Sequence, residues 1–261
     1  MIFVVGTKRS GTSMWMQALV AAGFPAIGSA FPQAWGERLR HHNPRGFYES
    51  MFRMGVNYQT NPHPETGQFL PPADVERHLV KVFPMGLVRS DFGYISQVVA
   101  TIRDWRSYDQ SVRKLRTDDR PNRTQKMPPW LEWWLENYSL IRDLVIRRYP
   151  VVVTSYDAVL RDPEREIGRV VDWLGGADRE AAIKSVDQEL HRSQPSAEEQ
   201  PDSTIVDVFD ALYEAIDLHQ TVPEALVVRM NETQARVLTE YREVIAATQP
   251  AAGESGQSAK K

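Results

Sequence analysis

A glycine-bounded loop near the N-terminus constrains the fold of this chain more than any other feature. Residues 2–5 form an apolar run that predicts a short strand, and residues 14–19 have the apolar pattern of a helix start. Between them the chain reads Gly6-Thr7-Lys8-Arg9-Ser10-Gly11-Thr12-Ser13. Such a loop points backbone N–H groups and the positive end of a helix at one spot, which suits a phosphate. The order of strand, loop and helix therefore predicts an α/β fold with a phosphate-binding loop after its first strand.

The loop nearly matches the pattern of nucleoside-triphosphate loops, G-x-x-x-x-G-K-[ST]. Both glycines and the last hydroxyl are present, but Thr12 occupies the position of the lysine that reaches the β- and γ-phosphates. Two cations, Lys8 and Arg9, come earlier in the loop instead. We therefore expect the loop to bind a 5′-phosphate that carries one transferable group. An incidental glycine turn and a degenerate triphosphate loop remain as alternatives.

The segment Lys8–Ser13 resembles the 5′-phosphosulfate loop, P-[KR]-[ST]-G-T-[TS], of the sulfotransferases that use 3′-phosphoadenosine 5′-phosphosulfate (PAPS). Arg9 matches the Lys or Arg of that loop, and Lys8 replaces its proline. The chain is thus similar to small soluble bacterial-type members of the family. The resemblance implies transfer of a sulfuryl group from PAPS to a hydroxyl or amine of a small-molecule, glycan or natural-product acceptor. It also implies 3′-phosphoadenosine 5′-phosphate (PAP) as the product and no required metal.

A second motif of this family is an apolar strand that ends in arginine, with a serine eight positions later. Val98–Arg103 and Ser111 match it. The resemblance implies that both side chains bind the 3′-phosphate, for which an arginine offers a fork of donors. An ordinary ion pair of the arginine is the alternative. Looser matches extend to about residue 193: Tyr156 is expected beside the adenine or in the core, and Arg192 belongs to a basic segment expected over the 3′-phosphate.

The leaving 5′-phosphate gains negative charge as the sulfuryl group departs, so preorganised donors must meet that charge. We expect the N–H groups of residues 10–13 and the side chain of Arg9 to do so. The hydroxyls of Thr12 and Ser13 are expected to add hydrogen bonds. Lys8 is expected to be either a second donor or a solvated lysine.

The acceptor hydroxyl needs a general base. Some branches of the family use a glutamate, and Glu49, which closes a family-like stretch that reads N-P-R-G-F-Y-E, is the first candidate. Glu37 is the second candidate, and His41 and His42 are further options. For Glu49 the alternative is structural: its carboxylate would stabilise the start of a helix expected over residues 50–59.

In animal-type members of the family, a histidine after a strand serves as the base, in the pattern K-T-H-x-P. Here residues 80–84 keep the lysine, as Lys81, and the proline, but Phe83 stands at the histidine position. This departure argues against a histidine mechanism. Lys81 is expected either to reach the bridging oxygen or sulfuryl group, or to be a surface lysine at the edge of a strand.

Length and composition predict one domain over residues 1–248, with a C-terminal helical part over about 204–248 and a disordered tail over 249–261. The net charge of −3 argues against a nucleic-acid partner. The chain has no cysteine, and no run approaches the roughly 20 apolar residues of a membrane span. Because the first strand leaves no room for a signal peptide, we expect a cytoplasmic protein. The last helix is expected to pack on the domain or to form a homodimer contact.

Apolar, β-branched runs alternate with helical stretches, which predicts a P-loop-like three-layer fold in which helices flank a central parallel sheet. The strands are expected at residues 2–6, 79–83, 97–102 and 150–155. The helices are expected at residues 12–22, 50–59, 105–116, 129–148, 164–174, 178–188, 204–219 and 223–247. Three tryptophans at helical spacing are expected either in the core or stacked on the acceptor, namely Trp130, Trp133 and Trp134.

Two other functions fit parts of this pattern. A P-loop kinase or nucleoside-triphosphatase gains support because Asp104 and Asp157 each follow an apolar strand, as a magnesium-binding aspartate would. The same reading loses support because Thr12 replaces the lysine of the triphosphate loop. A catalytically silent nucleotide-binding scaffold is the other alternative.

Overall fold

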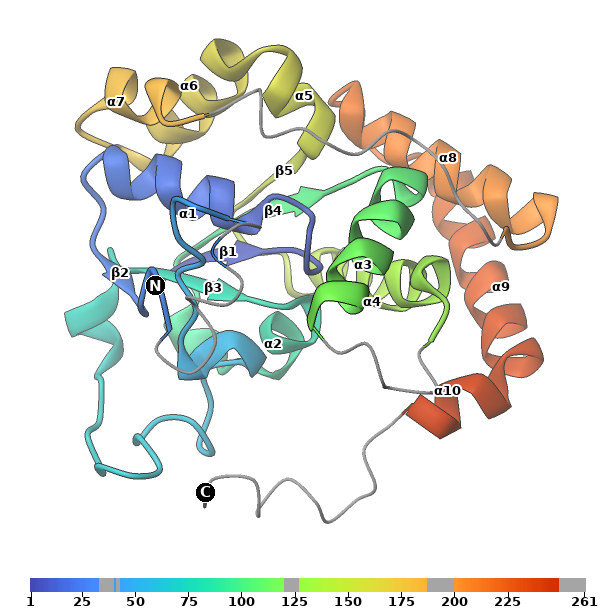
Figure 1. Cartoon of the computed structure of the whole chain (residues 1–261), viewed down its shortest axis with the longest axis horizontal. Coiled ribbons are helices and arrows are strands. Elements are labelled where there is room, and N and C mark those ends of the chain that lie inside the picture. Colours follow the sequence, from blue (N-terminus) through green and yellow to red (C-terminus); the bar gives the residue numbers. More distant parts are fainter. Residues whose placement is uncertain (33–39, 41–42, 120–126, 187–199, 249–261) are drawn as a thin grey trace.

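A central parallel sheet organises the molecule. The computed structural model describes residues 1–32, 40, 43–119, 127–186 and 200–248, and within these ranges five parallel strands form one sheet in the order β2-β3-β1-β4-β5 (Figure 1). The strands are β1 (Ile2–Val5), β2 (Ala26–Ile27), β3 (Leu79–Val82), β4 (Gln97–Ile102) and β5 (Val151–Ser155). The expected α/β fold is confirmed. The short strand β2 is the one that the sequence does not predict.

The strand order brings four segments to one edge of the sheet. β1 lies between β3 and β4, so later strands add to the sheet on both sides of it. Because all strands are parallel, their carboxyl ends share one edge, which is where such sheets bind ligands. The loop after β1 therefore shares this edge with Lys81 in β3, Arg103 after β4 and Tyr156 after β5.

Helices connect and cover the strands (Figure 1). They are α1 (Thr12–Ala21), α2 (Pro84–Arg89), α3 (Trp105–Asp119), α4 (Pro129–Arg147), α5 (Tyr156–Arg161), α6 (Pro163–Leu174), α7 (Arg179–Lys184), α8 (Ser203–Asp217), α9 (Glu224–Glu240) and α10 (Arg242–Thr248). The sequence does not predict α2 and α5, because six residues are too few to show a helical period. A break at Tyr241 divides the helix expected over 223–247, and the end of the one expected over 178–188 lies outside the described residues.

The helix expected over residues 50–59 is wrong. A 3₁₀ turn, Met51–Met54, forms instead, and the Ser50 hydroxyl caps it by accepting a hydrogen bond from the Phe52 N–H. Gly55, with φ of 112°, ends the turn. A Cβ at this glycine would lie 2.6 Å from the Gly86 carbonyl oxygen, so close packing against α2 excludes a side chain here.

The two faces of the sheet are buried by different helices, because side chains alternate along each strand. Ile2 and Val4 of β1 pack in a cluster with α1, α6 and α7. Phe3 and Val5 pack in a larger cluster, to which α2, α3, α4, α8 and α9 contribute. Figure 1 shows α1, α6 and α7 on one side of the sheet and α2 on the other, which gives the three layers.

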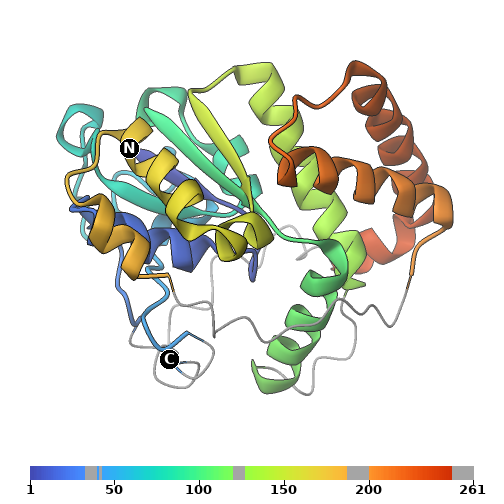
Figure 2. The same ribbon diagram turned by 90° about the horizontal axis from the view of Figure 1, so that it is seen from above.

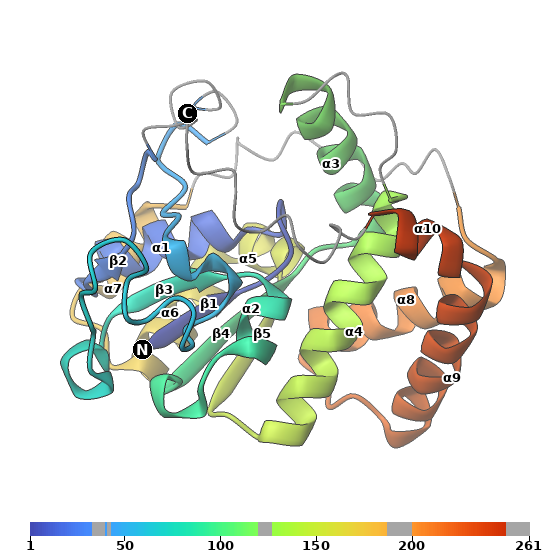
Figure 3. The same ribbon diagram turned by 90° about the horizontal axis from the view of Figure 1, so that it is seen from below.

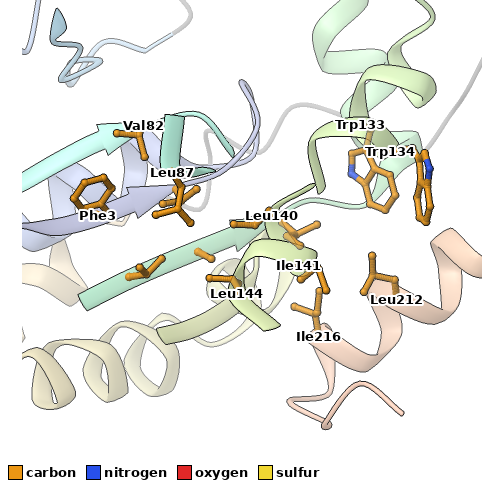
Figure 4. Packing of buried hydrophobic residues seen from close by; sticks show 14 of the residues in the cluster. Phe3, Val82, Leu87, Trp133, Trp134, Leu140, Ile141, Leu144, Leu212 and Ile216 are labelled. Carbon is orange, nitrogen blue, oxygen red and sulfur yellow. The ribbon is translucent and has the colours of Figure 1, made fainter. Parts of the chain in front are cut away.

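The tryptophans of α4 belong to the core. Trp130, Trp133 and Trp134 are at most 1% exposed, and the ring of Phe209 from α8 lies within 6.4 Å of each of their ring centres. Figure 4 shows Trp133 and Trp134 above Leu212 of α8. The core interpretation is therefore confirmed, and stacking of these rings on an acceptor is wrong.

The C-terminal helices lie beside α4, past the β5 edge of the sheet (Figures 2 and 3). Asp210 of α8 accepts hydrogen bonds from the Trp105 indole at 2.9 Å and from both terminal nitrogens of Arg106 at 2.7 and 2.9 Å. These bonds fix the start of α3, just after Arg103, to α8. Every helix in the described ranges is too short or too polar to cross a bilayer.

Candidate active site

The loop after β1 is fastened by hydrogen bonds from Ser10. The Ser10 hydroxyl donates to the Thr7 carbonyl oxygen at 2.7 Å, and the Ser10 N–H donates to the same oxygen at 3.2 Å. The Thr101 hydroxyl of β4 donates to the Ser10 carbonyl oxygen at 3.0 Å. Both donors of Ser10 are thus used inside the loop, whereas the sequence predicts that its N–H meets a phosphate.

The following residues present open N–H groups at the start of α1. Gly11 has φ of 98° and directly precedes the helix. Within the described chain, the N–H groups of Gly11, Thr12 and Ser13 have no acceptor, as expected for a first helical turn. They lie at the positive end of the α1 dipole. This part of the loop has the geometry of an anion-binding site.

Arg9, Arg103 and Ser111 come together above the sheet edge. The Arg9 Nε donates to the Ser111 Oγ at 3.0 Å, and an Arg103 terminal nitrogen donates to the Arg9 carbonyl oxygen at 3.1 Å. The sequence analysis assigns Arg9 to the 5′-phosphate and Ser111 to the 3′-phosphate, and in the structure the Arg9 side chain reaches that serine. The two expected groups of donors are therefore neighbours.

Neither guanidinium forms an ion pair among the described residues, although the charges of Asp157 and Asp104 reach Arg103. Burial lowers the pKa of Arg103, and burial together with the charge of Arg103 lowers the pKa of Arg9. Among the described residues no carboxylate lies within ion-pair distance of either group, and the buried Arg103 Nε has no hydrogen-bond partner. Two adjacent cations and an unsatisfied donor favour binding of an anion.

Tyr156, the first residue of α5, lies against this site. The Arg103 guanidinium lies 4.6 Å from the centre of the Tyr156 ring, in cation–π geometry. A Cβ at Gly11 would lie 2.6 Å from the ring, so the glycine is needed for this close approach. The ring is half-buried. This position beside the loop agrees with both expectations for Tyr156, which were a place beside the adenine and a place in the core.

Lys81 and Glu49 form an ion pair at the end of β3. The Lys81 Nζ lies 2.7 Å from Glu49 Oε1 and donates to the Ser13 Oγ at 3.0 Å and to the Phe47 carbonyl oxygen at 2.8 Å. Lys81 is 6% exposed and β3 is an internal strand, so the surface-lysine alternative is wrong. Burial lowers the pKa of Lys81, and the Glu49 charge opposes that shift. The Glu49 Oε2 is buried without a hydrogen-bond partner.

The structural alternative for Glu49 is also wrong. Ser50, not Glu49, caps the turn that follows. The backbone of Glu49 pairs instead with Ser29, by N–H to carbonyl hydrogen bonds of 3.0 and 3.1 Å. Tyr48 adopts the left-handed region, with φ of 55°, which is uncommon for a residue with a side chain. The carboxylate is thereby directed at Lys81 across the edge of the sheet.

Gln17 is a residue of this site that sequence reasoning missed. Its amide nitrogen donates to the Asn43 side-chain oxygen and to the Gly46 carbonyl oxygen, both at 2.9 Å. It therefore holds the segment leading to Glu49 against α1. The signal in the sequence is its spacing: Gln17 lies four residues after Ser13, on the same face of α1.

Lys8 points to a different partner from the one expected. Its ammonium forms an ion pair with Glu132 of α4, whose other oxygen lies 2.6 Å from Arg116. Lys8 is thus an ion-paired lysine that stays 36% exposed, and it shares its carboxylate with Arg116. Four expected site residues lie outside the described residues, namely Glu37, His41, His42 and Arg192.

The aspartates of the kinase alternative have structural partners. Asp104 accepts a hydrogen bond from the Ser107 N–H at 2.8 Å, near the start of α3. Asp157 accepts a hydrogen bond from the Tyr213 hydroxyl of α8. Burial raises the pKa of Asp104. Each carboxylate thus stabilises local structure.

No family model and no curated protein matches this sequence. Among solved structures, the chain is similar to the sulfotransferase domain from the curacin biosynthetic pathway, with a TM-score of 0.45 and 11% identity over 90% of this chain and 96% of that one. It is also similar to the sulfotransferase domain from the Synechococcus PCC 7002 olefin synthase, with a TM-score of 0.38 and 16% identity over 90% and 94%.

Proposed function

We propose that this chain is a sulfotransferase that takes its sulfuryl group from PAPS. One observation carries the proposal: Arg9 and Arg103 meet at the sheet edge, and no carboxylate of the described chain pairs with either. The mutual repulsion of the two cations makes an anionic ligand favourable there. PAPS supplies two anionic groups, the 3′-phosphate and the 5′-phosphosulfate.

The residues present fit both ends of this nucleotide. The unsatisfied Arg103 Nε and the Ser111 hydroxyl are the proposed donors to the 3′-phosphate. The open N–H groups of Gly11, Thr12 and Ser13 are the proposed donors to the 5′-phosphate. Tyr156, between these two groups of donors, is the proposed neighbour of the adenine.

Glu49 is the proposed general base. In the transfer, the acceptor oxygen or nitrogen forms a bond to sulfur, and the bond from sulfur to the bridging phosphate oxygen breaks with its electron pair on PAP. The acceptor proton passes to Glu49. A buried carboxylate oxygen without a partner, such as Glu49 Oε2, is costly, so a donor on the acceptor would satisfy it. Because this oxygen is closed to solvent, the side chains that cover it must move when the acceptor enters.

A phosphoryl-transfer enzyme is the other candidate, and the contacts disfavour it. Thr12 replaces the lysine that would reach a γ-phosphate. The aspartates that would hold magnesium, Asp104 and Asp157, accept hydrogen bonds from Ser107 and Tyr213.

Thermal unfolding with nucleotides tests the proposal. A ligand that binds the folded state raises the melting temperature by mass action. We expect PAP to raise it, and ATP with magnesium to have a much smaller effect. With ³⁵S-labelled PAPS, label should move to a member of a panel of phenols, alcohols and amines. A shift with ATP and magnesium alone would overturn the proposal, and a PAP shift without transfer to any acceptor or to water would favour a silent scaffold.

A further inference from the structure

The ammonium of Lys81 has three hydrogens, and the structure gives it three acceptors. These are Glu49 Oε1 at 2.7 Å, the Phe47 carbonyl oxygen at 2.8 Å and the Ser13 Oγ at 3.0 Å. The side chain is 7% exposed, so no solvent-facing hydrogen is left to turn toward a ligand. In this arrangement Lys81 has no N–H left to donate a hydrogen bond to a transferred group.

The three acceptors come from three different parts of the site. Ser13 belongs to the first turn of α1, next to the loop N–H groups. Phe47 and Glu49 belong to the segment that runs over α1, and Lys81 belongs to β3. One ammonium therefore joins the phosphate-binding end of the site to the proposed base.

We infer that Lys81 is a positioning residue, which acts on the reaction through Glu49 and Ser13 and does not touch the transferred group. The inference rests on the proposed function. Lys81 holds Oε1 of the carboxylate in place, which leaves Oε2 as the oxygen that receives the proton of the acceptor. Arg9 is the other charged group whose field reaches the ammonium.

The contact with Lys81 limits the direction in which the Ser13 hydroxyl can point its hydrogen. When the Ser13 oxygen accepts a hydrogen from Lys81, its own hydroxyl hydrogen must point elsewhere. The protein acceptor available to it is the Phe47 carbonyl oxygen, at a long 3.4 Å. A phosphate oxygen at the start of α1 would be a closer acceptor. Lys81 thus orients one hydroxyl toward the donor nucleotide and one carboxylate toward the acceptor.

A double-mutant cycle separates this role from direct contact. The variants are Lys81→Met, Glu49→Gln and the two combined, each assayed with ³⁵S-labelled PAPS and the best acceptor of the wild-type protein. Lys81→Met should lower kcat at least tenfold and change the Kd of PAP less than about threefold. In the Glu49→Gln background the same change should lower kcat less than about threefold. Equal losses in both backgrounds, or full activity of Lys81→Met, would overturn the inference.

Chemical rescue covers the case in which Lys81→Met does not fold. Because the chain has no cysteine, Lys81→Cys provides a single thiol. The thiol is alkylated in denaturant with 2-bromoethylamine, which restores an ammonium, or with 1-bromopropane, a neutral control of the same length, and the protein is refolded. The aminoethyl form should regain kcat relative to the propyl form. Equal kcat in the two forms would contradict the inference.

These outcomes are distinct from failure of the proposed function. If wild-type protein neither binds PAP nor transfers the label, the sulfotransferase proposal fails, and the inference fails with it. If wild-type protein is active and the two losses multiply in the double variant, only the positioning role of Lys81 is wrong.

Discussion

The positively charged side chains at the two ends of the candidate site differ in whether they form ion pairs. At the β4 end, Arg9 and Arg103 lie together, and no carboxylate of the described chain pairs with them. At the β3 end, Lys81 is paired with Glu49 and uses all three hydrogens on protein acceptors. Lys8, in the same loop as Arg9, is likewise paired, with Glu132.

Under the proposed function, this difference separates the cations proposed to bind the nucleotide from cations that hold the protein together. A buried cation without a partner is unfavourable, so its retention indicates an anion that arrives from outside. A paired cation gains little from a further anion, because its counter-charge must first be displaced. We therefore choose the residues proposed to meet the phosphate by the partners of their side chains, and not by the number of lysines and arginines in the motif.

The largest expected effect is at Glu49. Glu49→Gln should lower turnover by roughly 10²- to 10⁴-fold, because the amide cannot take the acceptor proton. The Kd of PAP should change little, since the donors to the nucleotide are unchanged. Glu132→Gln is the matched control: it also removes a carboxylate paired with a lysine, and it should leave turnover within about threefold of wild type. Full activity of Glu49→Gln would move the base to Glu37 or a histidine.

Loss of the unpaired arginine should come next. Arg103→Ala should weaken PAP by roughly 10- to 100-fold, in line with a hydrogen bond between charged groups. Adenosine 5′-phosphate, which lacks the 3′-phosphate, should bind wild type and variant almost equally. The control is Arg106→Ala, a paired arginine three residues on, which should leave both affinities unchanged. Titration calorimetry measures all six constants, and an equal loss for both nucleotides in Arg103→Ala would contradict the role of Arg103.

A smaller effect concerns how the stability of the protein depends on pH, and it involves Glu136, whose charged neighbours are Glu132 and Lys8. Burial, and then the nearby charge of Glu132, raise the pKa of Glu136 to about 8, from 4.5. The folded protein therefore keeps a proton that the unfolded chain releases, so stability present below pH 4.5 is lost as pH rises toward 8. Glu136→Gln should raise the free energy of unfolding by about 1 kcal/mol or more at pH 9, and by less at pH 5. Urea unfolding at both pH values tests this, and equal effects would contradict the shift.

The smallest effect is expected at Lys8. Because Lys8 is held by Glu132 of α4, Lys8→Ala should change the Kd of PAP less than about threefold. Arg9→Ala, one residue along the same loop, should weaken PAP much more. If the two variants weaken PAP equally, the distinction between paired and unpaired cations does not hold.

The phosphate loop and the parallel sheet could be predicted from the sequence because both rest on local patterns. The apolar run before Gly6 and the helix after Gly11 define the loop. The spacing of Arg103 and Ser111 predicts a shared site, and in the structure Arg9 contacts both residues. Helix α3 carries Ser111 back to the Arg9 side chain.

The partners of the charged residues could not be predicted. Glu132 is far from Lys8 in the sequence, and only the packing of α4 beside the loop brings them together. The environment of Lys81 likewise depends on β3 being an internal strand, which the order of strands along the chain does not reveal. The helix expected over 50–59 failed because packing of Gly55 against α2 outweighs local propensity.

The most direct test of the central claim is a crystal structure of the protein with PAP. The 3′-phosphate should contact the Arg103 guanidinium and the Ser111 hydroxyl, and the 5′-phosphate should accept hydrogen bonds from the N–H groups at the start of α1. Lys81 should keep its contacts with Glu49 and Ser13. A nucleotide bound away from the two arginines, or with its 3′-phosphate on Lys81, would contradict the account.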